Sequence, residues 1–230
     1  MAPPPPVIQQ TPASILIKSG EVARLHCYHG DDSYPYMLWY QSAAGGRQTM
    51  DLIGLLHYEN QNREKGFENR FNMTGHSKAD PSHSAVYFCA ASTHLSEAYF
   101  GSGTRLTVLE AGKNITLPIV KIIQPSANEC REQKSQKGKR RKTLVCVASD
   151  FYPDHVSVFW ELNKQSITDG VATDPAAKMD AATGNYTITS RLRVLAKHWF
   201  EPQNKFKCIV RFFDGKNNTD HSVTVSCKLI

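Results

Sequence analysis

Two cysteine pairs with identical spacing constrain this chain more than any other feature. Cys27 and Cys89 are 62 residues apart, and so are Cys146 and Cys208. A tryptophan follows the first cysteine of each pair, after 12 residues in the first copy and after 14 in the second. A repeat of this kind in a chain of 230 residues predicts two copies of one small domain.

Short alternating segments indicate strands in both copies. Ala23–Cys27, Thr104–Val108 and Tyr186–Leu192 alternate apolar with polar residues, as half-buried strands do. Turn residues such as Gly45–Gly46 and Asp214–Gly215 separate the segments. Many short strands with such punctuation predict antiparallel sandwiches and an all-β fold.

Together, the repeat and the strand pattern resemble the immunoglobulin family. The resemblance implies that each cysteine pair forms a disulfide between two sheets and that the tryptophan packs on it. Tyr87 stands at the tyrosine-corner position of the first copy, whereas Phe206 occupies that position in the second. We therefore expect two immunoglobulin-like β-sandwiches in tandem, a variable-type domain with its joining segment over 1–110 and a constant-type domain over 111–230.

A glycine-rich motif after the second cysteine narrows the family. Phe100-Gly101-Ser102-Gly103-Thr104 begins 11 residues after the cysteine of Ala85–Cys89. Glycines allow the chain to bulge as it enters the last strand, and we expect Phe100 to pack under the preceding loop. This arrangement resembles the joining segment of rearranged antigen receptors.

Motifs in the second half resemble the constant domain of T-cell receptor beta chains. They are Leu144–Cys146, Asp150–Val156, Gly170–Pro175, Ser190–Val194 and Trp199–Cys208. The resemblance implies an antigen-recognition subunit that binds peptide presented by a major histocompatibility complex molecule jointly with an alpha chain. A gamma-type receptor chain and an immunoglobulin-like adhesion module are the alternatives. The former should lack motifs such as Phe151–Val156, and the latter should lack the joining motif.

The resemblance also implies a location and further partners. The chain would be the extracellular part of a plasma-membrane receptor and would pass its signal to invariant signalling subunits. The opening residues MAPPPPV resemble no signal peptide, and no apolar run approaches the roughly 18–20 residues of a membrane span. We therefore expect the membrane anchor to lie beyond Ile230.

Three loops at one end of the variable-type domain are the expected ligand-binding site. Tyrosine supplies stiff contact area, while asparagine and serine adapt their hydrogen bonds. In an isolated sandwich such loops could be solvated connections, and the joining motif is what favours recognition. The expected contact residues are Asp31, Asp32, Tyr34 and Tyr36 in the first loop, Tyr58, Glu59 and Asn60 in the second, and Thr93, His94, Leu95, Ser96 and Glu97 in the third.

The remaining cysteines and the glycosylation sequons indicate an oxidising compartment. Cys130 and Cys227 could form a bridge within the constant-type domain, or Cys227 could pair with the alpha chain. None of the six cysteines has the C-x2-C spacing of a zinc or redox site. The even number of cysteines and the presence of sequons favour an extracellular protein. The candidate glycosylation sites are Asn72, Asn114, Asn185 and Asn217.

Charge and side-chain chemistry exclude several other functions. Residues 111–230 hold 19 Lys and Arg against 11 Asp and Glu, and the run from Arg131 to Lys142 contains seven of these basic residues. No aromatic residue interleaves with the run, so we expect no nucleic-acid binding. Asp154, His155 and Ser157 do not amount to a catalytic triad. We expect no catalytic residues, no metal site and no cofactor.

The chain departs from the family pattern at several places. The connection between the last two strands, about Phe213 to His221, lacks the long mammalian insertion, which suggests a non-mammalian, avian-like source. Ser42 stands where a glutamine usually contacts the partner domain. No full apolar strand is evident in Thr74–Ser84, so that strand is either reduced or missing from this chain.

Overall fold

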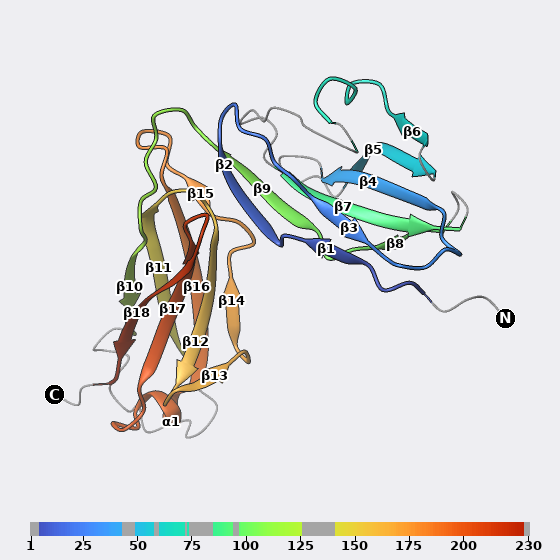
Figure 1. The fold of residues 1–230 in the computed structure, drawn as a ribbon. Helices are drawn as coiled ribbons and strands as arrows, with labels where there is room; N and C mark the ends of the chain where they lie inside the picture. Colours follow the sequence, from blue (N-terminus) through green and yellow to red (C-terminus); the bar gives the residue numbers. More distant parts are fainter. Residues whose placement is uncertain are drawn as a thin grey trace. The chain divides into compact units, whose positions relative to one another are not determined.

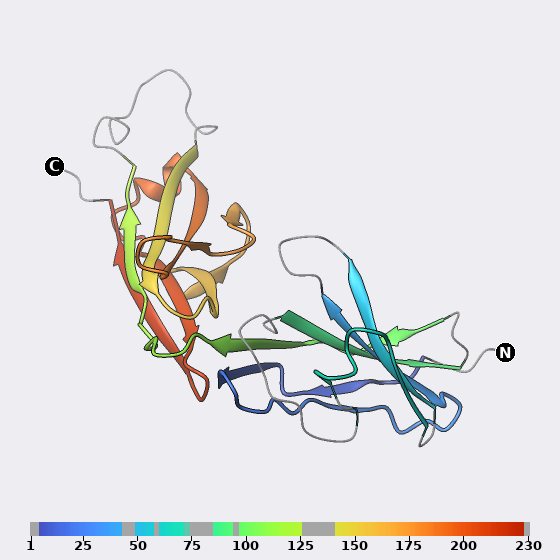
Figure 2. The same cartoon turned by 90° about the horizontal axis from the view of Figure 1, so that it is seen from above.

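The computed structural model describes residues 5–42, 49–57, 60–71, 73, 85–93, 97–125 and 141–227. The chain divides into two compact units, Met1–Lys113 and Asn114–Ile230, which we call the N-terminal and C-terminal domains (Figures 1 and 2). One short helix apart, the described secondary structure consists of β-strands. The predicted all-β fold of two sandwiches is therefore confirmed.

The N-terminal domain is built around one large sheet. At one edge of this sheet, Ser14–Lys18 and Thr104–Leu109 pair in parallel, and the other strand pairs are antiparallel. The strand order is β2 (Ser14–Lys18), β9 (Thr104–Leu109), β7 (Ala85–Ser92), β4 (Tyr36–Ser42), β5 (Met50–His57) and β6 (Asn60–Arg63), with β8 (Tyr99–Phe100) also paired to β7.

The second sheet of this domain is smaller in the described residues. It consists of β1 (Gln9–Thr11) and β3 (His26–Tyr28). The predicted strand over Ala23–Cys27 is thus shorter and later in the chain, because within the described residues only His26–Tyr28 has a ladder partner. The stretch Thr74–Ser84, where we expected a reduced or missing strand, lies outside the described residues.

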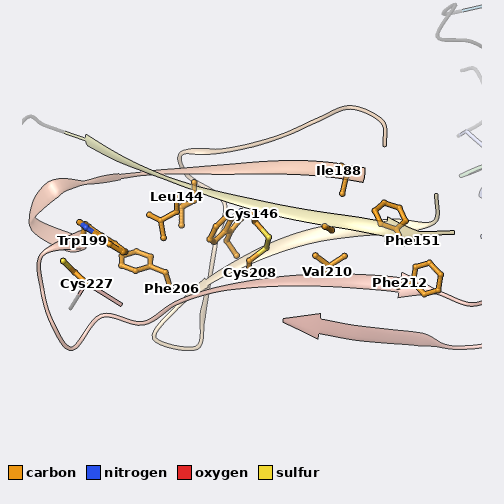
Figure 3. Close-up of a cluster of buried hydrophobic side chains, with 13 residues drawn as sticks. Leu144, Cys146, Phe151, Ile188, Trp199, Phe206, Cys208, Val210, Phe212 and Cys227 are labelled. Carbon is orange, nitrogen blue, oxygen red and sulfur yellow. A yellow bond between two sulfur atoms is a disulfide. The ribbon is translucent and has the colours of Figure 1, made fainter. Parts of the chain in front are cut away.

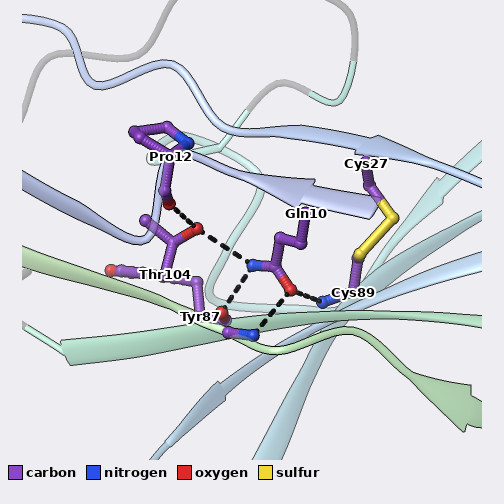
Figure 4. Close-up of a disulfide and its surroundings, with 7 residues drawn as sticks. Gln10, Pro12, Cys27, Tyr87, Cys89 and Thr104 are labelled. Atoms are coloured by element: carbon purple, nitrogen blue, oxygen red, sulfur yellow. Dashed lines mark hydrogen bonds between the residues drawn. A yellow bond between two sulfur atoms is a disulfide. The ribbon is translucent and has the colours of Figure 1, made fainter. Parts of the chain in front are cut away.

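A disulfide and a tyrosine form the centre of the N-terminal core. Cys27 and Cys89 are bonded, which closes a loop of 62 residues and stabilises the domain by roughly 4 kcal/mol. Tyr87 is fully buried and packs with Ile53 and Leu106, while Trp39 lies against the same cluster. The Cys27–Cys89 bond and its neighbours are shown in Figure 4.

Two sheets form the C-terminal domain, each with a main order of four strands. The first sheet has the order β10 (Ile119–Ile123), β11 (Arg141–Phe151), β16 (Tyr186–Leu195) and β14 (Val171–Thr173), with β15 (Lys178–Met179) also paired to β16. The second has the order β13 (Gln165–Ile167), β12 (Val156–Leu162), β17 (Phe206–Phe213) and β18 (Asn218–Val225). Helix α1 (Ala196–Trp199) follows β16.

The C-terminal core is larger and more continuous (Figure 3). The Cys146–Cys208 disulfide lies inside it, beside the fully buried Trp160. The Trp160 indole N–H donates to Ser190 Oγ over 3.0 Å, so the buried ring leaves no polar atom without a partner. Phe206, at the tyrosine-corner position, is fully buried and packs against Trp199.

Candidate functional site

Strand pairing brings the three predicted loops to one end of the N-terminal domain. Tyr36 at the start of β4 pairs with both His57 at the end of β5 and Ser92 at the end of β7. The β3–β4, β5–β6 and β7–β8 connections therefore begin or end beside one another. Of the twelve predicted contact residues, Tyr58, Glu59, His94, Leu95 and Ser96 lie outside the described residues, and their roles remain predictions.

The first loop is organised by Asp31. Its carboxylate accepts the backbone N–H of Ser33 over 2.9 Å, and its carbonyl accepts that of Tyr34 over 3.1 Å. Aspartate commonly begins a turn in this way. The turn leaves Asp32 and Ser33 exposed, so they can contact a ligand.

Tyr34 has a different position from the one expected. Its side chain is only 3% exposed, and its ring meets the edge of Tyr99 at 5.7 Å and that of His29 at 6.5 Å. Burial raises the pKa of Tyr34, with smaller contributions from Tyr99, Asp31 and Glu97. Tyr34 therefore supports the first and third loops from beneath, and we assign it a positioning role instead of a ligand contact.

The other described loop residues lie around this support. The rings of Tyr36 and His57 stack at 4.3 Å with 12° between their planes, and Asn60 is exposed beside His57 in the β5–β6 register. The Ser92 hydroxyl donates to the Glu97 carbonyl, which joins the two sides of the third loop at its base. Glu97 is exposed and Thr93 is half-buried.

Sequence reasoning missed the aromatic support of the loops. His29, His57 and Tyr99 were not expected to take part, yet each stacks on or meets a tyrosine of the first loop. The available signal was their place in the sequence, with His29 and His57 beside the tyrosines of the first two loops and Tyr99 directly before the joining motif. The support joins all three loops to the sheet.

A second surface lies on the outer face of the large sheet. Phe100 is 46% exposed and Met50 is 47% exposed, and the Phe100 ring lies 5.4 Å from that of Tyr40. We call these three residues the Tyr40–Phe100 face. The expectation that Phe100 packs under the preceding loop was therefore incomplete, because its ring packs on Tyr40 and nearly half of it is exposed.

The glycines of the joining motif are required by close packing. A side chain at Gly101 would lie 2.8 Å from Gln10 Oε1 and 3.1 Å from Cys89 Sγ. Gly103 has a φ of +86°, and a Cβ there would lie 2.7 Å from the Phe88 ring. Glycine is the residue that suits both constraints.

The structure locates some of the other predicted sites. Asn114 and Asn217 are exposed and Asn185 is half-buried, while Asn72 lies outside the described residues. Cys227 is 5% exposed and belongs to the core of the C-terminal domain. Its predicted partner Cys130 lies outside the described part of the chain.

The described residues contain no group of three or more His, Cys, Asp or Glu side chains arranged to hold a metal ion. In the same residues, no helix has the length and apolar character needed to cross a membrane.

Comparison with known proteins agrees with this arrangement of domains. Residues 10–109 match the immunoglobulin V-set domain, and residues 128–214 match the immunoglobulin C1-set domain. A crystal structure of a chicken TCR has a TM-score of 0.72 and 33% identity, covering 95% of this chain and 98% of that one.

Curated relatives name a particular receptor chain. A viral T-cell receptor beta chain-like protein of feline leukemia virus is 35% identical over 226 residues, which is 89% of this chain and 66% of the relative. The C region of the T-cell receptor beta chain of rabbit, Oryctolagus cuniculus, is 44% identical over 103 residues, 44% of this chain and 55% of the relative. The chain thus spans about two thirds of the viral relative and about half of the rabbit one.

These relationships settle the class of protein. T-cell receptor domains of this kind are extracellular parts of receptors and belong to a family that is not enzymatic. The tandem V-set and C1-set domains, the chicken structure and the beta-chain relatives agree with one another. The chain therefore belongs to the T-cell receptor family and is homologous to receptor beta chains.

Proposed function

We propose that this chain is the antigen-recognition subunit of a cell-surface alpha-beta T-cell receptor. In this role it pairs with an alpha chain and binds peptide presented by a major histocompatibility complex molecule. Signalling passes to invariant subunits of the receptor complex. The observation that carries the proposal is the Tyr40–Phe100 face, which lies on the same sheet as the three loops.

The Tyr40–Phe100 face has the chemistry of a pairing surface. Aromatic residues and methionine are enriched at the buried centres of protein interfaces, and Phe100 and Met50 are each nearly half exposed. Burying these side chains against a partner would remove apolar surface from water, at about 25 cal/mol per Å². Ser42, where the family usually has a glutamine, accepts the backbone N–H of Val86, so its hydroxyl is engaged inside the domain.

The C-terminal domain offers a second surface to the partner chain. Ile119 and Ile123 on β10 are 51% and 59% exposed, while Val120 and Ile122 between them pack on the core. Two large aliphatic side chains on one face of an edge strand suit contact with another constant-type domain. The proposed heterodimer therefore uses both domains.

The loop geometry supports binding of a composite ligand. The contact of the buried Tyr34 with the half-buried Tyr99 fixes the bases of the first and third loops, which lowers the entropy lost on binding. We place the third loop over the peptide, with His94 and Leu95 as its central contacts. The first two loops, including the exposed Asp32 and Asn60, would lie mainly on the presenting molecule.

Light scattering of the refolded chain with an alpha-chain ectodomain of the same species tests the pairing. We expect a 1:1 heterodimer from the wild type and none from Phe100→Arg, because the new charge would be buried without a partner. Phe159→Arg is the matched control, since Phe159 is 44% exposed on β12, in the sheet of the C-terminal domain that does not carry β10, and it should pair normally.

The outcomes separate the alternatives. A wild-type chain that stays monomeric with every alpha chain would contradict the proposal and favour the gamma-type receptor or the adhesion module. If pairing occurs, the heterodimer can be tested against presented peptides by surface plasmon resonance. Normal binding by both His94→Ala and Leu95→Ala would then exclude the central role of the third loop.

A further inference from the structure

Basic side chains gather at one end of the C-terminal domain. This end, which we call the basic end, carries α1, the beginnings of β11 and β17 and the β12–β13 turn (α1 is labelled in Figure 1). At the opposite end, the carboxylates of Asp180 and Asp214 each accept two backbone N–H groups of their own turns. The basic end consists of Arg141, Lys142, Lys164, Lys197 and Lys205.

A continuous set of contacts joins the first part of the basic end. Arg141 pairs with Leu195, the residue before α1, in the β11–β16 register. Lys142 Nζ lies 5.6 Å from the centre of the Phe200 ring, just after α1. Lys197 is exposed within α1 itself.

Hydrogen bonds connect α1 to the other two lysines. The side-chain amide nitrogen of Asn204 donates to the His198 carbonyl over 2.8 Å, and its oxygen accepts from Asn163 Nδ2 over 2.8 Å. Asn163 Oδ1 in turn accepts the backbone N–H of Lys205 over 2.9 Å, and Lys164 follows Asn163 in the turn. The five basic residues therefore belong to one rigidly connected end of the sandwich.

Three lysines of this end have no acidic partner among their described neighbours. Within the described residues, no carboxylate forms an ion pair with Lys164, Lys197 or Lys205. Glu201 is the exposed acidic residue between α1 and Lys205, so positive charge dominates. By contrast, Arg211 of the same domain is neutralised by an ion pair with an aspartate of β18.

The basic end also lacks exposed apolar anchors. The exposed large hydrophobic residues of the described C-terminal domain, Phe159 and Met179 among them, include none from α1, the β12–β13 turn or the Phe200–Lys205 segment. The centres of protein interfaces are usually held by such anchors, and so are amphipathic helices at a membrane surface. A flexible polyanion needs no apolar anchor, because its binding rests on charge and on the release of counterions.

We propose that the basic end binds sulfated glycosaminoglycan, the kind of polyanion found outside cells. The domain belongs to an extracellular receptor family, and clusters of Lys and Arg are the feature that recognises heparin-like chains. Lysine and arginine side chains on α1, β11 and the β12–β13 turn would contact successive sulfate groups. This site is separate from the antigen loops, which belong to the other domain.

Binding of the full chain to heparin tests the proposal. We expect saturable binding at about 0.15 M salt, and an affinity that falls steeply with added salt. The variant Lys164→Glu, Lys197→Glu, Lys205→Glu should bind at least about tenfold more weakly and lower the salt slope by about three. The matched control is Lys121→Glu, Lys178→Glu, Lys216→Glu, which changes the net charge equally at exposed lysines away from the basic end and should bind within about twofold of wild type.

Any one of three outcomes would overturn the proposal. Equal losses in the two triple variants would mean that heparin senses only net charge, and equal binding to desulfated heparin would remove the role of sulfate. Tighter binding to phosphatidylserine vesicles than to heparin would assign the basic end to a lipid surface. An unchanged thermal midpoint shows that a variant is folded, and the same three lysines changed to glutamine provide a milder replacement if the glutamates prevent folding.

Discussion

The side-chain amide nitrogen of Gln10 lies 2.7 Å from the carbonyl oxygen of Tyr87 and donates to it (Figure 4). The amide oxygen of the same side chain accepts the backbone N–H groups of Cys89 and Gly103, each over 3.1 Å. Gln10 is 6% exposed. One buried glutamine from β1 thus satisfies the backbone of β7 and of the joining motif beside the disulfide.

Replacing Gln10 with alanine should destabilise the N-terminal domain by about 3 kcal/mol or more, because several buried backbone groups would lose their partners. Gln10→Glu should also destabilise the domain, since its buried carboxylate can accept from Cys89 and Gly103 but has no proton to donate to the Tyr87 carbonyl. Urea unfolding with the disulfides intact measures both changes. A loss below about 1 kcal/mol for the alanine variant would show that water replaces the side chain.

Tyr87 should make the N-terminal domain less stable at alkaline pH. Burial raises its pKa from 10.0 to about 12, and Arg70 opposes this shift. The folded state therefore holds the phenol proton that the unfolded chain loses, so stability is complete below pH 10 and declines as the pH rises toward 12. The expected contribution between pH 9 and 11 is about 1 kcal/mol.

The measurement compares the pH dependence of unfolding in the wild type and in Tyr87→Phe. Each variant is referred to its own stability at pH 9, which removes any constant cost of the lost hydroxyl. The phenylalanine variant should show a shallower decline. Parallel curves would mean that Tyr87 ionises in the folded domain as readily as in the unfolded chain.

Local sequence patterns predicted the elements that depend on neighbouring residues. Alternation identified β9 and much of β16, and the spacing of cysteines identified both sandwiches. Gln10 gave no such signal, because its partners Tyr87 and Thr104 are 77 and 94 residues away. Gln10 can take this role only after folding has brought β1 close to β7.

The candidate site was predictable in outline and not in its internal roles. Composition identified tyrosines and aspartates in the first loop, but it could not separate the exposed Asp32 from the buried Tyr34. That difference depends on Tyr99, which comes from the other side of the third loop. The exposure of Phe100 likewise depends on where Tyr40 lies across the sheet.

The two roles in the first loop predict different effects on stability. Tyr34→Ala should lower the stability of the N-terminal domain by about 3 kcal/mol, because it removes a buried aromatic ring and leaves a cavity. Asp32→Ala should change stability by less than about 0.5 kcal/mol, since Asp32 is exposed. Thermal or urea unfolding compares the two, and equal effects would contradict the positioning role of Tyr34.

The position of Cys227 favours a bridge within the C-terminal domain. Its side chain is 5% exposed and lies in the same core cluster as Trp199 and Phe206 (Figure 3). A disulfide requires the two Cα atoms to lie about 4.4–6.8 Å apart. A cysteine of another chain can come that close to the buried Cys227 only if the domain opens. We therefore predict that Cys227 pairs with Cys130 and not with the alpha chain.

Peptide mass mapping of the oxidised chain should recover Cys130 and Cys227 in one disulfide-linked pair. Cys130→Ser and Cys227→Ser should each lower the stability of the C-terminal domain by roughly 2–5 kcal/mol, the usual cost of losing a native bridge. Neither change should alter the covalent state of the alpha-beta heterodimer on a non-reducing gel, because the predicted bond does not cross between the chains. A covalent wild-type heterodimer that separates only in Cys227→Ser would assign the cysteine to the partner chain, and its buried position would then have to open during assembly.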